Sequence, residues 1–259
     1  MATKAYGRMV FWEGASLWVM GTRPGEGAYP KTGFHSHHAI QVTVALRGTI
    51  TLESEHQEFR GGVVAVAPDT EHTFEADADG IVALLFIDPE GRLGRAVHNV
   101  LFADTDVVAI PSSRLGELPT LLRAAFENRR RNDQTLIDLG RALITLLAPG
   151  SERDERPEVR VRRMSAWAAE RLDAPVSLTD AAAHVGLSSG RARHLFVEAT
   201  GLPFRTYVVW LRLMRAVELY SAGSSLTDAA HGAGFSDSSH LSRTFRRMFG
   251  VSADSLRVM

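Results

Sequence analysis

The sequence contains no cysteine among its 259 residues. Disulfide bonds, thiolate metal ligands and thiol redox switches are therefore excluded. Apolar residues make up 45% of the chain, which supports real cores, yet no apolar run reaches the roughly 18 residues of a membrane-spanning helix. Residues 1–8 also lack the apolar core of a signal peptide. These absences lead us to expect a cytoplasmic protein that has no membrane partner.

Charge is distributed unevenly along the chain. The formal net charge of −1 by itself argues against nucleic-acid binding, and it excludes a protein that wraps DNA without regard to sequence. From residue 158 onward, however, 13 arginines and no lysine stand against 9 acidic residues, a net of +4, whereas the remainder carries 16 basic and 21 acidic groups, a net of −5. Arginine can donate two hydrogen bonds at once to a phosphate or to a guanine edge. The basic part is therefore expected to bind DNA, while some of its arginines lie on solvated helix faces.

A twelve-residue pattern occurs twice in this basic part. Residues 177–188 read SLTDAAAHVGLS and residues 225–236 read SLTDAAHGAGFS, so 8 of 12 positions are identical. Two copies of one supersecondary unit are indicated, and each is typical of a helix-turn-helix. A serine and an aspartate form a capping box, a glycine allows a left-handed turn, and a second serine caps the next helix. An ordinary helical hairpin is the alternative. The expected caps, turn glycines and inward residues are Ser177, Asp180, Gly186, Ser188, Leu195 and Phe196 in the first copy, and Ser225, Asp228, Gly234, Ser236, Leu241 and Phe245 in the second.

The C-terminal part, from about residue 160 to residue 259, resembles the DNA-binding domain of the AraC/XylS family of bacterial transcription regulators. The family signature falls on residues 229–250, and residues 204–222 match its connecting helix. Such a helix is roughly 30 Å long, close to the roughly 34 Å of one DNA turn. The resemblance implies a double-stranded DNA operator as partner, and RNA polymerase as well if the protein is an activator. The residues that it assigns to DNA binding are Arg191, Arg193, His194, Ser238, Ser239, His240 and Arg243.

The N-terminal part shows short β segments separated by turn residues. Examples are residues 16–20, 41–46, 48–52, 63–66 and 81–87, within a region from about 9 to 88. Many short strands at even spacing predict a small barrel or jelly roll. Residues 35–41, HSHHAIQ, and residues 67–72, APDTEH, resemble the two cupin motifs.

Four residues of these motifs are candidate ligands. In metal-binding cupins a His-x-His pair, a carboxylate four residues later and a later histidine hold one metal, and the resemblance places them on His35, His37, Gln41 and His72. Alternation along a strand turns the first three to one side, so we expect these residues to line the effector pocket. Three imidazoles suit one divalent Zn, Ni, Cu or Fe ion, although Gln41 offers a neutral oxygen in place of glutamate. Hydrogen bonding of an organic effector without metal is the alternative. His38 is expected to point outward, to the surface.

Residues 112–148 change to a helical period, with a turn at Asn132-Asp133. One of the two expected helices can cover the barrel, and the other can form the seam of a homodimer. The resemblance agrees, because family members with a cupin-like domain commonly dimerise through helices placed here. The alternative is that both helices pack only on their own barrel. The two apolar stripes are Leu115, Leu118, Leu122, Ala125 and Phe126, and then Leu136, Leu139, Leu143, Leu146 and Leu147, the second being the expected seam.

The sequence thus predicts two domains. Residues 1–148 form an all-β cupin-like jelly-roll barrel with a helical dimerisation hairpin, residues 149–158 form a polar linker, and residues 159–259 form an all-α double helix-turn-helix. The predicted function is a sequence-specific DNA-binding transcription regulator controlled by a small molecule or metal, and not an enzyme. The alternative is a cupin-type metalloenzyme fused to a DNA-binding module, since three histidines could activate oxygen or water. No separate acid–base pair is evident for such chemistry.

Overall fold

The computed structural model describes residues 5–12, 14–22, 31–128, 132–149, 159–200, 202–253 and 256–258. Nearly all of the predicted linker, from residue 150 to residue 158, lies outside these ranges. The chain divides into two compact units. The first comprises Met1–Pro89, Leu93–Glu152 and Phe245–Met259, and the second comprises Glu90–Arg92 and Arg153–Thr244. This division differs from the predicted boundaries at the C-terminal end, because the last segment groups with the β-rich unit.

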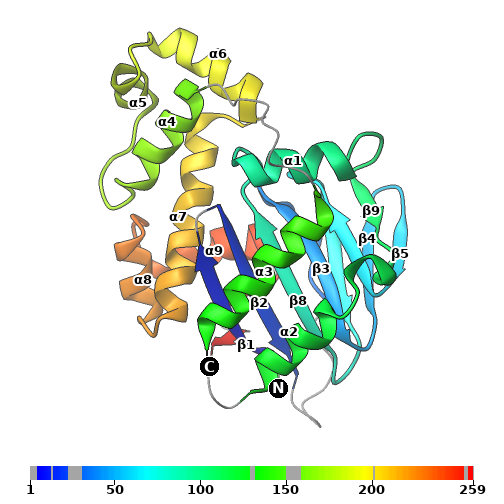
Figure 1. The fold of residues 1–259 in the computed structure, drawn as a ribbon. Helices are drawn as coiled ribbons and strands as arrows, with labels where there is room; N and C mark the ends of the chain where they lie inside the picture. The colour runs from blue at the N-terminus through cyan, green and yellow to red at the C-terminus, as the bar shows by residue number, and fades with distance from the viewer. Residues whose placement is uncertain are drawn as a thin grey trace. The chain divides into compact units, whose positions relative to one another are not determined.

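Two β-sheets make up most of the first unit (Figure 1). The larger has seven strands in the order β10-β1-β2-β8-β3-β6-β9, and the smaller has three in the order β5-β4-β7. Strand β10 runs parallel to β1, whereas the other paired strands are antiparallel. Four of the five strand segments named from the sequence lie within strands, and the fifth, 48–52, overlaps β4 from residue 50 onward. The bounds are β1 Ala5–Trp12, β2 Ala15–Gly21, β3 Ile40–Arg47, β4 Ile50–Ser54, β5 Glu58–Gly61, β6 Val63–Val66, β7 His72–Ala76, β8 Ile81–Ile87, β9 Val107–Ala109 and β10 Leu256–Val258.

Strand β3 is buried on both faces, so its side chains point alternately into two different interior regions. Ile40, Val42 and Val44 join the apolar core that also holds the buried leucines of two helices. Gln41 and Thr43 are polar and buried, and they stand opposite Phe86 and Leu84 of β8 in the ladder. One face of the strand therefore builds the core, and the other face contributes polar groups to an interior site.

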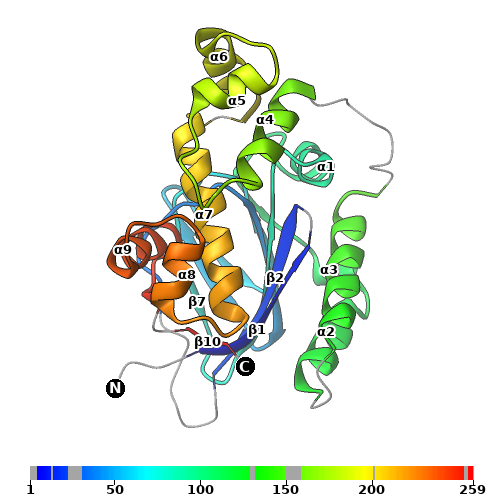
Figure 2. The ribbon, with the colours of Figure 1, turned by 90° about the vertical axis from the view of Figure 1, so that its left-hand side faces the viewer.

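Helices α2 (Leu118–Glu127) and α3 (Asp133–Leu147) pack on each other and on the larger sheet, where α2 contacts β3 and α3 contacts β1 and β2 (Figures 1 and 2). Leu136, Leu143 and Leu147 are fully buried in the core of their own protomer. The prediction that their stripe is free to form a dimer seam is therefore wrong, because the sheet already covers it. Of the stripe, only Leu146 is exposed, at 39% of its surface. Two further helices, α1 (Arg92–Leu101) and the 3-10 helix η1 (Ser112–Leu115), precede α2.

Close contacts fix α2 and α3 on β1. The buried Arg8 of β1 donates through Nη1 to the carbonyl of Ala125, at 3.1 Å, and through Nη2 to Asp133 Oδ1, at 2.6 Å. A side chain at Gly140 would lie 2.5 Å from the ring of Trp12, so the glycine lets α3 approach the strand closely. Residue Asn132 caps α3 by accepting from the backbone of Gln134.

The second unit consists of helices and contains the predicted repeat. Helices α5 and α6 form one helix-turn-helix, α8 and α9 form the other, and α7 connects them (Figure 1). Each motif has the expected left-handed glycine, with φ of 70° at Gly186 and 80° at Gly234. The last residues of α9 belong to the first unit. The bounds are α4 Val159–Ala169, α5 Leu178–His184, α6 Ser189–Thr200, α7 Phe204–Ser221, α8 Leu226–Gly232 and α9 Ser238–Phe249.

The capping boxes follow the prediction. Ser177 and Ser225 each accept a hydrogen bond from the backbone of the aspartate three residues later, at 3.1 Å, and donate to its carboxylate, at 2.6 Å. Ser188 accepts from the backbone of Arg191 at the start of α6. Across the part of the chain that the structure describes, no helix combines the length and apolarity needed to cross a membrane.

Candidate effector pocket and DNA interface

Three histidines predicted from the sequence converge inside the first unit. His35, His37 and His72 are all buried, and one ring nitrogen from each lies within 4.8 Å of the others. His35 and His72 pair across an isolated antiparallel bridge with two backbone hydrogen bonds of 3.1 and 2.9 Å. The ring of His37 lies 5.3 Å from that of His72, between centroids. A loop before β3 and the start of β7 thus bring the three imidazoles together.

Strand alternation is not the reason for this convergence. Residues 36–39 form no strand, and β3 begins only at Ile40. For the same reason His38 does not point to the surface as expected, because alternation does not apply in a loop. It is only 3% exposed, and its Nδ1 lies 2.9 Å from Asp69 Oδ2. Asp69 in turn donates its backbone N–H to the carbonyl of His37, so the turn before His72 holds the loop from the other side.

Hydrogen bonds from the ring nitrogens to backbone carbonyls orient the imidazoles of His35 and His72. Nδ1 of His35 lies 2.9 Å from the carbonyl of Gly33, and Nδ1 of His72 lies 2.9 Å from the carbonyl of Thr70. A carbonyl only accepts, so Nδ1 carries the proton in both rings and Nε2 keeps its lone pair. Among the described residues Nε2 of His72 is buried without a hydrogen-bond partner. This is how histidines that bind metal are usually held.

Gln41 acts on the cluster through His37. Its Oε1 lies 2.9 Å from His37 Nε2, and its Nε2 donates to Thr43 Oγ1 at 3.0 Å. The amide oxygen therefore accepts from His37 and fixes the orientation of that ring. In this arrangement Gln41 positions a histidine, and its oxygen is already engaged.

Burial keeps the three rings neutral. Loss of solvation lowers the pKa of His35, and it lowers the pKa of His37 to about 4, with a further contribution from the neighbouring His35. The pKa of His72 falls well below its ordinary value, first through burial and then through His37 and His35. The neutral imidazole is the form that binds a metal ion. A tetrahedral metal holds ligand nitrogens about 3.4 Å apart, whereas these three lie within 4.8 Å of one another, so the rings could hold an ion only after they move closer together.

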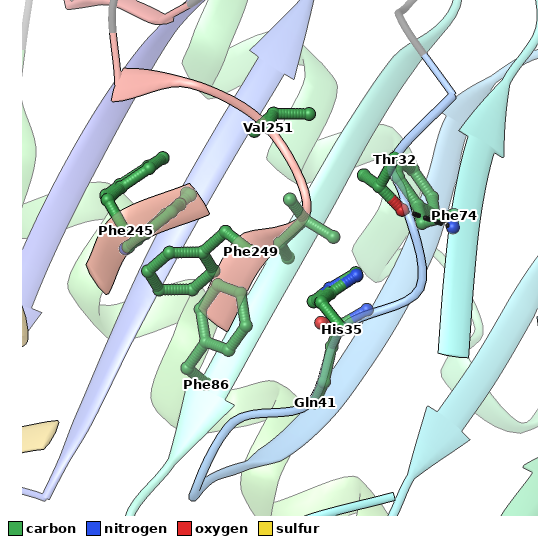
Figure 3. A pocket seen from close by; sticks show the side chains of 10 residues that line it. Thr32, His35, Gln41, Phe74, Phe86, Phe245, Phe249 and Val251 are labelled. Carbon is green, nitrogen blue, oxygen red and sulfur yellow. Dashed lines mark hydrogen bonds between the residues drawn. The ribbon is translucent and has the colours of Figure 1, made fainter. Parts of the chain in front are cut away.

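An aromatic pocket lies beside His35 (Figure 3). His35 and Gln41 form its polar side, and the other walls are mostly apolar. The remaining cavity measures about 30 Å³, room for one or two water molecules. The other lining residues are Trp18, Leu84 and Phe86 of the larger sheet, Thr32 and Phe74, and Phe245, Phe249 and Val251 of the C-terminal segment.

The predicted DNA-reading residues differ in their exposure. Arg191, Arg193 and His194 of α6 are exposed. On α9, Ser239 and Arg243 are exposed and lie one helical turn apart, so they share a face. Ser238 and His240 are half-buried. The ring of His240 packs edge-on against Phe235 at 5.1 Å, and its Nδ1 lies 3.2 Å from Ser236 Oγ.

Ser236 does not cap α9 as predicted. The helix begins at Ser238, and Asp237 Oδ1 accepts from the backbone N–H of His240 at 2.7 Å. Ser236 instead donates to the other carboxylate oxygen of Asp237. The hydrogen bond from the backbone of His240 lowers the pKa of Asp237. Aspartate is as good a cap as serine, so the sequence did contain the signal, one residue beyond the repeated pattern.

Sequence reasoning also missed a contact that holds the second motif. Arg212 of α7 donates to the carbonyls of Leu172 and Ala174, at 3.2 and 2.9 Å. A side chain at Gly234 would lie 1.9 Å from the carbonyl of Leu172 and 2.8 Å from Arg212 Nε. The turn glycine of the second motif is therefore packed against the loop that follows α4.

Comparisons with known proteins agree with this arrangement. Residues 181–258 match the family model of a helix-turn-helix domain. The chain is 34% identical over 238 residues to the HTH-type transcriptional activator RhaS of Escherichia coli (strain SMS-3-5 / SECEC), which covers 86% of each protein. It is 24% identical over 261 residues to the protein of the same name from Escherichia fergusonii, covering 90% of this chain and 88% of that one.

Solved structures show the same fold. ToxT from Vibrio cholerae matches with a TM-score of 0.61 at 12% identity, covering 93% of this chain and 97% of that one. ToxT from Vibrio cholerae strain SCE256, solved with an unsaturated fatty acid bound, matches with a TM-score of 0.56 at 12% identity, covering 97% and 92%.

Proposed function

Since the chain belongs to the AraC/XylS family of transcription regulators, we propose that it reads a DNA operator with both helix-turn-helix motifs under the control of an effector. The effector binds in the first unit, which we propose is a cupin-like sensor domain. The observation that carries the proposal is the pair of capped motifs, each of which exposes arginine on its second helix. The RhaS relatives are named as activators, and we extend that role, with its contact to RNA polymerase, to this protein.

The arginines are the strongest candidates for base reading. A guanidinium can bond to both acceptors of guanine in the major groove, and such a pair discriminates against the wrong base by about 1–3 kcal/mol. Arg191 and Arg193, with His194, serve the first motif. Arg243 and Ser239 contact the bases for the second motif. Ser238 and His240 are half-buried and contact DNA only at the edge of the exposed face of α9.

For the effector site we propose one divalent transition metal, Zn, Ni, Cu or Fe, held by His35, His37 and His72, with Gln41 as the residue that orients His37. The buried Nε2 of His72 without a partner and the neutral state of the rings support this assignment. When bound, such an ion supplies a Lewis acid that can hold the polar head of an organic effector. The second form of the proposal is an organic effector that bonds directly to the same histidines. The relatives are regulators, so we assign a regulatory use, not a catalytic one, to this cluster.

We further propose a homodimer, formed by the outer faces of α2 and α3. The buried stripe of α3 is not available for it. Leu121 of α2 and Leu146 of α3 are exposed over 49% and 39% of their surfaces, and they offer apolar contacts on the side away from the sheet.

Operator selection tests the function. The full-length protein is used to select binding sequences from random DNA, and Arg243→Ala is then compared with wild type on the selected site and on unrelated DNA at fixed salt. We expect the variant to lose about 1–3 kcal/mol on the selected site and much less on unrelated DNA. Arg215→Ala is the matched control, because Arg215 is an exposed arginine paired with Glu218 on α7. Equal losses on both DNAs would make Arg243 a phosphate contact, and failure to select any sequence would contradict the proposed function.

A further inference from the structure

The pocket beside His35 has polar groups suited to a ligand but almost no room for one. Nε2 of His72 is buried without a partner among the described residues, and Nε2 of His35 keeps a lone pair because Nδ1 donates to Gly33. Yet the cavity of about 30 Å³ holds no more than one or two waters. The whole body of an organic molecule with a ring needs more space than this, so a side chain of the pocket would have to move to admit it.

The side chain that fills this room comes from the far end of the sequence. Phe249, the last residue of α9, lies beside Phe86 in the pocket (Figure 3). Its ring is 5.6 Å from that of Phe86 and 5.0 Å from that of Trp18, between centroids. It lies 6.0 Å from the ring of His37 and is only 6% exposed. An aromatic ring from the C-terminal segment thus forms part of the pocket beside the histidines.

Two sets of backbone contacts hold the described residues of the segment that carries this ring. We call residues 245–253 and 256–258 the C-terminal latch. Gly33 donates its backbone N–H to the carbonyl of Gly250 at 3.0 Å, and β10 pairs with β1 over three residues at the edge of the larger sheet. By comparison, β2 and β8 pair over seven residues inside the same sheet. A side chain at Gly250, where φ is 68°, would lie 2.8 Å from His35 Nδ1, so glycine lets the latch pass directly over the histidine.

We propose that the C-terminal latch and the effector exclude one another from this pocket. The ligand class is a molecule with an apolar body, which replaces the ring of Phe249, and one head group that bonds to His35 or to a metal on the histidines. The inference rests on the proposed role of this pocket as the effector site. Arg243 stands six residues before Phe249 on the same helix, about 9 Å along its axis. Release of the latch would therefore free one end of the helix that reads DNA.

The absence of cysteine makes a direct test simple, because a single introduced thiol is unique in this chain. Ala253→Cys reports on the latch, where the alanine is 6% exposed, and Ala76→Cys in β7, where it is 3% exposed, is the matched control. Both are labelled with N-ethylmaleimide under native conditions. If the latch opens without unfolding of the sheets, the latch cysteine reacts about tenfold faster or more. Phe249→Ala in the same background raises its rate further.

The ligand is probed with 8-anilinonaphthalene-1-sulfonate, an apolar ring system with one anionic head. We expect it to bind the Phe249→Ala variant more tightly than wild type, and to accelerate labelling of the latch cysteine but not of the cysteine in β7. Phe126→Ala is the control for a cavity made elsewhere in the first unit, since Phe126 is 5% exposed and lies outside the pocket. Phe249→Leu replaces the alanine variant if circular dichroism shows that the latter is unfolded.

Two results overturn the inference. One is a latch cysteine that reacts no faster than the cysteine in β7, with or without the probe. The other is equal probe binding by the Phe249→Ala and Phe126→Ala variants. Operator binding is measured on the same preparations, so that failure of the latch inference can be told apart from failure of the proposed function. Wild type that binds its operator while the thiols react equally refutes the latch alone, whereas loss of sequence preference refutes the regulator itself.

Discussion

The two turn glycines of the repeat should respond very differently to the same substitution. Gly186 and Gly234 occupy equivalent positions and have similar left-handed φ values of 70° and 80°. Around Gly186 nothing lies within 4 Å of the place that a side chain would take. At Gly234 that place is 1.9 Å from the carbonyl oxygen of Leu172 and 2.8 Å from Arg212 Nε. The comparison therefore separates backbone strain from loss of packing.

The expected magnitudes follow from these distances. Alanine in the left-handed region costs about 1–2 kcal/mol, so Gly186→Ala should lower the free energy of unfolding by that amount. Gly234→Ala has the same strain, and in addition the carbonyl of Leu172 must move away. That movement breaks its hydrogen bond from Arg212, which contributes about 1.5–3 kcal/mol because the donor is charged. We expect a total loss of about 2.5–5 kcal/mol for Gly234→Ala.

The assay is urea denaturation of the full-length protein, followed by the helical circular-dichroism signal. Arg212→Ala in the wild-type and Gly234→Ala backgrounds completes a double-mutant cycle, and we expect the two effects to be far from additive. A Gly234→Ala variant that is no less stable than Gly186→Ala would refute the reasoning. It would mean that the loop after α4 moves away without any loss in the free energy of unfolding.

Two further predictions concern the first unit. Leu121→Glu combined with Leu146→Glu should convert a dimer at micromolar concentration into a folded monomer in sedimentation experiments. The reason is that charge replaces the apolar contacts on the outer faces of α2 and α3. A wild-type monomer would contradict the proposed dimer. In calorimetric titration of the metal-free protein with Zn²⁺, His72→Ala should lose at least about tenfold in affinity. His56→Ala, at an exposed position, should lose none. Wild-type binding no tighter than millimolar would contradict the proposed metal site.

Features that depend on local chemistry could be predicted from the sequence. The capping serines Ser177 and Ser225 and the glycines at both turns act within a few residues of their own position, so the repeated pattern was enough to place them. The candidate histidines were also found, although for a partly wrong reason. His35 and His72 meet through a bridge between distant segments, and strand alternation has no part in it.

Features that depend on tertiary packing could not be predicted in this way. A leucine stripe on an amphipathic helix looks the same whether a sheet or a second protomer covers it, so the buried state of Leu136 and Leu143 required the fold. The burial of His38 depends on Asp69, which lies thirty-one positions away in sequence. Phe249 belongs to a family signature for DNA binding, and nothing in its local sequence indicates that its ring fills a pocket beside the histidines.

Helix α9 contains residues of both units. Asp237 caps its first turn, Arg243 lies at its centre, and Phe249 ends in the aromatic pocket. The division between the units falls within it, between Thr244 and Phe245. A regular helix bends sharply only where its hydrogen-bond ladder is broken, and residues 238–249 contain neither proline nor glycine. Displacement of Phe249 by a ligand can be absorbed by rotation of its own side chain, by unwinding of the last turn that leads to Gly250, or by movement of the helix that carries Arg243. Of these, only movement of the helix itself changes how the second motif presents Arg243, and this is the response that an effector-controlled regulator requires.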